Sequence, residues 1–394
     1  MATFEAALRV EGASLDARLA RLGAAIRGRV EPDGTIVAMS ALTWSLPRAL
    51  ALYAQALANP QFHLRDFARV RAAQAELISR ELCNPNNLAL RLLPRMLYPA
   101  GHHDGSQRGY GSGRTNAILT PEDLRKYFAE HLSPTCATLI VAGGPGCKEM
   151  RALLEDSFGR WNDTSSRIQP HPVKRRQLTA SPGVGEGPDV ILIDLPGAKQ
   201  AVLYMGLRVP RRESTLAIVI DAVFARMFTS RLNLKLRETK GWTYGIRSWL
   251  SQTRDDTQWI ISCSVHQDRT TESMREVLET LEGLAFHAPC GEEELRGAIN
   301  YLVGHNYSHF ETCADTADAL ANSVLLDQPI DYVWNSPARL RKSRTAQVAD
   351  SCKRILAAHN PCWIVVGNAA ELVDRLYKAG HGHIKIISGQ GIPS

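Results

Sequence analysis

The chain has 394 residues, of which 44% are hydrophobic and 22% charged, and its formal net charge is +6. This composition excludes disorder, collagen and coiled coil, and the length predicts two domains instead of one core. The positive charge is spread along the chain, without the basic stripe and interleaved aromatic residues of a nucleic-acid surface. No apolar run approaches the roughly 18 residues of a spanning helix, so we expect no membrane span.

The start of the chain, MATFEAALRV, shows no basic region followed by an apolar stretch, and therefore no signal peptide. The compartment stays open, because the order of elements described below places the start of the chain within a domain, which is also compatible with a lost leader. We expect the periplasm if a leader has been removed and the cytoplasm otherwise.

The first part of the chain contains a recognisable order of elements. A segment at Leu22–Arg27 and a strand at Asp33–Ala38 precede two helical stretches, Pro47–Leu57 and Leu64–Leu82. A Thr-capped amphipathic helix from Thr120, a turn marked by Pro134 and an apolar strand over 137–143 follow.

The second part begins with two apolar strands, Val190–Leu195 and Ala201–Leu207, and a helix, Leu216–Phe228. It then repeats the earlier order, which we read as a duplication. The repeated elements are a segment at 240–245, a strand at 256–261, helices over 271–284 and 291–310, a helix capped by Thr345 and a strand over 362–367.

This repeat predicts an α+β protein of two homologous halves, each with an antiparallel-rich sheet backed by helices. The first half covers residues 1–164, a linker rich in Pro, Gly and basic residues covers 165–188, the second half covers 189–378, and a tail covers 379–394. The first half lacks counterparts of the two strands that open the second, so we expect it to be incomplete at its N-terminus.

The cysteines do not form a recognisable metal or redox motif. Eight are present without a CxxC pair, which argues against a zinc ribbon, a redox dithiol or an iron–sulfur site. Cys136 and Cys362 stand in apolar, strand-like runs, and we expect both to be packed thiols.

The most informative segment reads SRLNLKLRETKGWTYG, from Ser230 to Gly245. It resembles the second half of the M16 metallopeptidases, the family of pitrilysin, insulinase and the mitochondrial processing peptidase, whose motif reads S-R-L, L-R-E and G-x-x-Y. The resemblance covers nearly the whole chain and includes the duplication, Gln200 in the second strand and Glu294-Leu295 at the start of a late helix.

The resemblance implies a catalytic role for Arg237 and Tyr244. In the family this pair reaches the zinc site and donates hydrogen bonds to the scissile carbonyl as negative charge develops on it. Gly241 allows the turn that brings the chain from a helix end into a strand. Outside the motif, an exposed arginine and a half-buried tyrosine would be the plainer interpretation.

The resemblance also shows what this chain lacks. Active members carry H-x-x-E-H, in which two histidines bind zinc and the glutamate is the general base, together with a later glutamate ligand. Alignment places Thr3, Ala6 and Ala7 at the H-x-x-E-H positions, and Glu76 about where the distal ligand would stand. We expect Glu76 to be a solvated or capping helix residue or a relic of that ligand. No metal is therefore expected in this chain.

Other candidate sites are weaker. His305 and His309 share the i, i+4 spacing of a metal-binding helix face, but Ser308 occupies the place of a general base. The histidines at 102–103 and at 381 and 383 lie in Gly-rich loops. Two further Gly-rich stretches, at 109–113 and 183–188, lack the context of a phosphate-binding loop.

We therefore expect a subunit of a heterodimeric zinc metalloendopeptidase that cleaves peptides, inactive by itself. A zinc-bearing partner would supply H-x-x-E-H, as in bacterial M16 members that divide the zinc motif and the Arg/Tyr pair between two chains. The alternative is a non-catalytic scaffold, like the M16-derived core subunits of respiratory complex III. A trimmed active peptidase is a third possibility, and the alanines at 6 and 7 weigh against it.

Overall fold

The computed structural model describes residues 9–10, 13–98, 110–159, 161 and 189–389, which form two compact units. Unit 1 draws on Met1–Ile78, Ser112–Arg175 and His309–Ile330, and unit 2 on Ser79–Gly111, Arg176–Ser308 and Asp331–Ser394. Each unit thus includes a segment from the other end of the chain. The expected linker over 165–188 lies outside the described residues. None of the described helices is long and apolar enough to cross a lipid bilayer.

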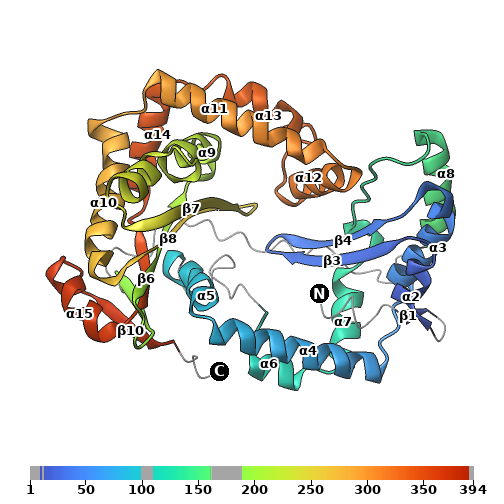
Figure 1. The fold of residues 1–394 in the computed structure, drawn as a ribbon. Coiled ribbons are helices and arrows are strands. Elements are labelled where there is room, and N and C mark those ends of the chain that lie inside the picture. Colours follow the sequence, from blue (N-terminus) through green and yellow to red (C-terminus); the bar gives the residue numbers. More distant parts are fainter. Residues whose placement is uncertain (1–8, 11–12, 99–109, 160, 162–188, 390–394) are drawn as a thin grey trace. The chain divides into compact units, whose positions relative to one another are not determined.

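Unit 2 is built on a mixed sheet of six strands in the order β10-β5-β9-β6-β8-β7. Figure 1 labels β6, β7, β8 and β10 of this sheet. β10, β5 and β9 run parallel, and the remaining neighbours are antiparallel, so the sheet is less antiparallel than expected. The stretch expected to be a tail contributes the edge strand β10. The strands are β5 (Val190–Asp194), β6 (Gln200–Val209), β7 (Thr243–Gln252), β8 (Thr257–His266), β9 (Cys362–Gly367) and β10 (Ile384–Ser388).

Both faces of this sheet are covered, because its central strands are apolar on both sides. Val190 and Leu192 face one core and Ile191 and Ile193 face the other. The second core is closed by α5 (Pro85–Leu97), a helix from the first part of the chain. The first core is closed by α9 (Ser214–Asp221), α10 (Thr270–Glu282), α11 (Glu292–Asn306), α13 (Tyr332–Leu340), α14 (Thr345–Ala358) and α15 (Ala369–Lys378).

Unit 1 contains the antiparallel hairpin of β3 (Ala25–Glu31) and β4 (Gly34–Ser40). α12 (Cys313–Leu325), from late in the chain, lies against it, and Arg29 reaches Asp318 at 3.2 Å and Asn322 at 2.9 Å. The other elements are β1 (Arg9–Val10), β2 (Ala13–Ser14), α2 (Leu15–Ala20), α3 (Leu46–Ala58), α6 (Gly113–Ile118), α7 (Pro121–His131), α8 (Cys147–Phe158) and most of α4 (Leu64–Cys83), whose last turn belongs to unit 2.

One of the two predicted helix caps is confirmed. The Thr120 hydroxyl accepts the Asp123 N–H at 3.2 Å, and the Asp123 carboxylate accepts the Thr120 N–H at 2.9 Å. These reciprocal bonds satisfy donors at the start of α7 that would otherwise be unpaired. At the start of α14 the prediction is wrong, because Thr345 is already helical. The cap residue there is Arg344, whose N–H donates to Gln347 Oε1 at 3.0 Å.

The apolar strand predicted over 137–143 is also wrong. Residues 137–142 form no strand, Leu139 is 49% exposed and Val141 44% exposed. Cys136, expected to be packed, is exposed as well. In unit 2 the strand β9, to which the predicted duplication matches this run, is paired on both sides, by β5 and β6. The described part of unit 1 offers no such neighbours, and a strand without partners cannot satisfy its backbone groups.

Candidate functional site

The motif folds as predicted into a helix, a turn and a strand. Arg237 lies in a π-helical stretch, Asn233–Thr239, of a kind that is rare and often found at functional sites. Gly241 follows with a φ of 62°, the left-handed conformation that glycine adopts without strain. β7 begins two residues later, so Tyr244 is the second residue of an edge strand.

Arg237 lies against an exposed aromatic ring. The centre of its guanidinium group is 3.6 Å from the ring centroid of Phe228, which is itself 68% exposed. Its Nε donates to Glu238 Oε1 at 2.9 Å. Stacking holds the plane of the guanidinium and leaves its N–H groups directed along the edge, where they can form paired hydrogen bonds. Sequence reasoning did not identify Phe228 as a partner, and it quoted Glu238 only as part of the motif, without a role.

Tyr244 is 99% exposed, the highest value among the large hydrophobic side chains of the described residues. Among the described residues, no hydrogen bond joins its side chain to Arg237 or to any other residue. The chain therefore presents the phenol to solvent at the edge of the sheet. The two motif residues stand on adjoining elements without touching one another.

The helix that carries Arg237 is fastened to α10 by a buried carboxylate. Glu276 is 6% exposed, accepts a hydrogen bond from Lys240 at 2.5 Å and forms an ion pair with Lys235. Burial alone would raise the pKa of Glu276, but the two ammonium groups outweigh it and lower the pKa below the usual range. Lys235 and Lys240 bracket Arg237, so this pair of bonds fixes the helix on both sides of it.

A second ion pair fastens the start of the motif to α11. Arg231 binds both oxygens of Glu294, at 2.7 and 2.6 Å, and Glu294 also accepts the Gly291 N–H at 3.0 Å. The hydrogen bonds from Arg231 lower the pKa of Glu294 below its usual range. The sequence had marked Arg231 and Glu294 separately, and the structure brings them together.

Gln200 lies at the same end of the sheet as Tyr244. The strand β8 lies between β6 and β7. Its residue His266 pairs with Gln200 of β6, and its residue Val265 pairs with Thr243 of β7, the residue before Tyr244. A shallow cavity of about 590 Å³ opens here, lined by Ala198, Lys199, Gln200 and His266. Polar side chains capable of binding peptide groups therefore flank the end of β7 that carries Tyr244.

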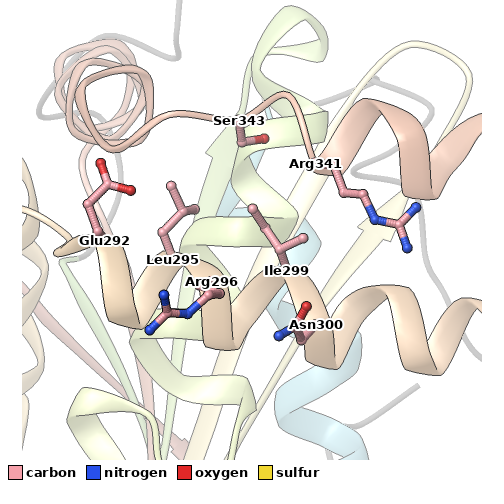
Figure 2. A pocket seen from close by; sticks show the side chains of 7 residues that line it. All are labelled: Glu292, Leu295, Arg296, Ile299, Asn300, Arg341 and Ser343. Atoms are coloured by element: carbon pink, nitrogen blue, oxygen red, sulfur yellow. The ribbon is translucent and has the colours of Figure 1, made fainter.

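A second hollow, of about 310 Å³, lies between α11 and the connection from α13 to α14 (Figure 2). Figure 2 shows Leu295 and Ile299 rising from α11 toward the loop that bears Arg341 and Ser343. None of its lining residues belongs to the segment from Ser230 to Gly245. The remaining lining residues are Glu292, Arg296 and Asn300.

The described residues do not fit a zinc ion. In the part of the chain that the structure describes, no group of three or more His, Cys, Asp or Glu side chains could hold a metal. Glu76 is an exposed residue of α4. Thr3, Ala6 and Ala7 lie outside the described residues.

The two histidines considered as a metal pair do not share an α-helix. α11 ends at Asn306, so only His305 belongs to it, and His309 lies in the 3-10 turn Tyr307–Phe310. The ring of His305 is stacked on Tyr301, with 6.4 Å between the centroids and 4° between the planes. The helical spacing that suggested a shared face therefore does not apply.

The comparisons with known proteins point to similar sequences and to a similar fold. Residues 119–302, which include the whole motif, match the family described as Peptidase M16 inactive domain. A protein named an uncharacterized zinc protease of Mycobacterium tuberculosis (strain CDC 1551 / Oshkosh) is 25% identical over 263 residues. That alignment covers 64% of this chain but only 58% of the relative.

Solved structures show the same fold at low sequence identity. A peptidase M16 inactive domain from Pseudomonas fluorescens superposes with a TM-score of 0.78 and 18% identity, over 93% of this chain and 87% of that one. A chain of complex III2 from Candida albicans gives 0.73 and 12% identity, over 96% and 88%. Part of the chain, residues 119–302, is therefore similar to the M16 inactive-domain family, and the chain shares the α+β fold of these M16-like structures.

Proposed function

We propose that this chain is one subunit of a heterodimeric M16 zinc metalloendopeptidase and contributes Arg237 and Tyr244 to its active site. A partner subunit with H-x-x-E-H would supply the zinc and the general base, since the described residues of this chain do not fit a metal. The observation that carries the proposal is the exposure of Tyr244, whose side chain is 99% exposed and has no role in the packing of its own chain.

The chemistry of the pair suits a developing oxyanion. The guanidinium group of Arg237 offers several N–H donors in one plane, and the phenol of Tyr244 offers one O–H donor. Both stabilise negative charge on a carbonyl oxygen when they are already in place before the reaction. The Glu238 carboxylate that now accepts from Arg237 belongs to a side chain that is 52% exposed, so it has room to turn into solvent when a substrate carbonyl binds to Arg237.

Two homologous halves remain part of the proposal. In support of it, α5 lies between α4 and α7 within the first run of elements, and α12 stands at the matching place in the second run, between α11 and α14. α5 covers a face of the unit 2 sheet, whereas α12 belongs to unit 1 and lies against its hairpin. Such reciprocal use of matching helices is what an ancient duplication would leave.

The competing function is a non-catalytic scaffold. The fold likeness to a chain of complex III2 and the description of the matched family as inactive favour it. It predicts assembly with a partner but no contribution of Arg237 or Tyr244 to turnover.

Reconstitution separates the two functions. The chain is purified alone and together with an M16 protein that carries H-x-x-E-H, starting with any encoded next to it, and cleavage of a fluorogenic unfolded peptide is measured. We expect negligible cleavage by this chain alone, and cleavage by the mixture that a chelator abolishes. A stable complex without any cleavage would favour the scaffold.

A further inference from the structure

The structure assigns to Asn233 the task of positioning Tyr244 relative to Arg237. Asn233 is the first residue of the π-helical stretch that carries Arg237, and it is 4% exposed. Its side chain reaches forward to the strand that carries Tyr244 and backward to the end of the preceding helix. This inference rests on the proposed role of the pair but concerns a residue outside it.

The forward contact is a hydrogen bond to β7. The Ile246 N–H donates to Asn233 Oδ1 at 3.1 Å, and this bond is buried. The pairing of β7 with β8 is irregular between Thr243 and Ile246, so Tyr244 and Gly245 lie within a bulge. Bulges leave residues unpaired and redirect a side chain. Asn233 therefore holds the residue directly after the bulge that turns Tyr244 outward.

The backward contacts fix the other end of the same amide. Asn233 Nδ2 lies 3.1 Å from the carbonyl oxygens of Ala225 and Met227 and 3.1 Å from Ser230 Oγ. Ala225 belongs to the π-helical turns that end at Arg226, and Met227 is already extended. One side chain thus ties the end of a helix, the following turn and the strand together.

Only an amide can make this set of contacts at this size. The forward contact needs an acceptor and the backward contacts need a donor, and the short side chain of asparagine has both. An aspartate would keep the acceptor and lose the donor, and an aliphatic residue would lose both. Leaving the Ile246 N–H without its partner would release the bulge, because a buried N–H that has lost its acceptor is unstable there.

Hydrogen exchange of the chain alone tests the geometric part. Asn233→Ala is compared with Asn306→Ala, a second buried asparagine of unit 2, which bonds instead to the Val333 carbonyl at 3.4 Å. We expect amides of residues 243–246 to exchange about tenfold faster in Asn233→Ala, with less than about a twofold change in β8. Asn306→Ala should leave residues 243–246 unchanged. Asn233→Ser serves as a second variant if Asn233→Ala does not fold.

Unchanged exchange over 243–246, or equal acceleration throughout β8, would overturn the inference, because Asn233 would then be an ordinary buried asparagine. In the reconstituted peptidase we expect Asn233→Ala to lower kcat with little change in KM. Combined with Tyr244→Phe, it should lose little more than Tyr244→Phe alone. If the double variant loses kcat by the product of the two single-variant factors, Asn233 does not act through Tyr244. If no cleavage can be reconstituted, the proposed function fails, while the exchange measurement still decides the role of Asn233.

Discussion

Replacing Tyr244 by phenylalanine removes one hydroxyl from a side chain that its own chain leaves in solvent. Because the ring is 99% exposed, the hydroxyl contributes no packing and no internal hydrogen bond. Exposed substitutions away from special features change the free energy of unfolding by less than about 0.5 kcal/mol. We therefore expect Tyr244→Phe to unfold at the same temperature and denaturant concentration as the parent chain.

The expected effect on catalysis is large by comparison. Removing one donor to a developing oxyanion costs on the order of tenfold to a thousandfold in kcat, which corresponds to about 1.4–4 kcal/mol. KM should change little, since the hydrogen bond strengthens only as charge develops. Arg237→Ala should lose at least as much, because the bond from a guanidinium group is charge-assisted.

The assay measures peptide cleavage by the reconstituted complex, together with its zinc content and its elution volume. Tyr377→Phe is the matched control, because Tyr377 is also exposed, at 52%, and lies on α15 outside the motif. It should retain full turnover. If the Tyr244→Phe complex is intact, holds its zinc and cleaves at the parent rate, the phenol is not a donor to the reaction. The scaffold function would then be the better account.

Dialysed protein should contain far less than one zinc per chain by elemental analysis, and a stoichiometric content would contradict the absence of a fitting ligand set among the described residues. Burial and the charge of Arg208 lower the pKa of His359 to about 4. Unfolding between pH 4 and pH 6.5 therefore takes up a proton, and the free energy of unfolding should decrease as the pH falls from about 6.5 to 4. In denaturant titrations, His359→Asn should flatten that dependence. Leu93→Ala, on the fully buried face of α5, should cost about 2–5 kcal/mol in the unfolding of unit 2, and a loss below 1 kcal/mol would refute the packing of α5 on the sheet. Val141→Lys should change the free energy of unfolding by less than about 0.5 kcal/mol, because Val141 is exposed. Val365→Lys should prevent folding, because Val365 in β9 is 0% exposed. If both substitutions are equally destabilising, residues 137–142 are buried like β9.

The elements that the sequence predicted correctly depend on contacts between neighbours along the chain. Thr120 caps α7 because its hydroxyl and the carboxylate three residues later lie within one helical turn. Gly241 turns the chain from the Arg237 helix into β7 because glycine alone adopts a positive φ without a steric penalty. The apolar runs of β5 and β9 likewise predicted strands, and both form in the sheet.

Other features depended on partners that lie far away in the sequence. The run over 137–142 has the composition of a strand, yet it forms none, because strand formation requires neighbours that the described part of unit 1 does not supply. The sequence also assigned residues 85–97 to the first half. In the structure these residues form α5, which covers an apolar face of the unit 2 sheet.

The candidate site divides in the same way. The motif by itself identified Arg237 and Tyr244, because their residue types, their spacing and the glycine between them are local. Tertiary structure decided that Phe228 supports the guanidinium, that Glu276 holds the helix through two lysines, and that the phenol faces solvent. Local geometry can be read from neighbouring residues, whereas the support of a side chain depends on which distant surfaces the fold brings against it.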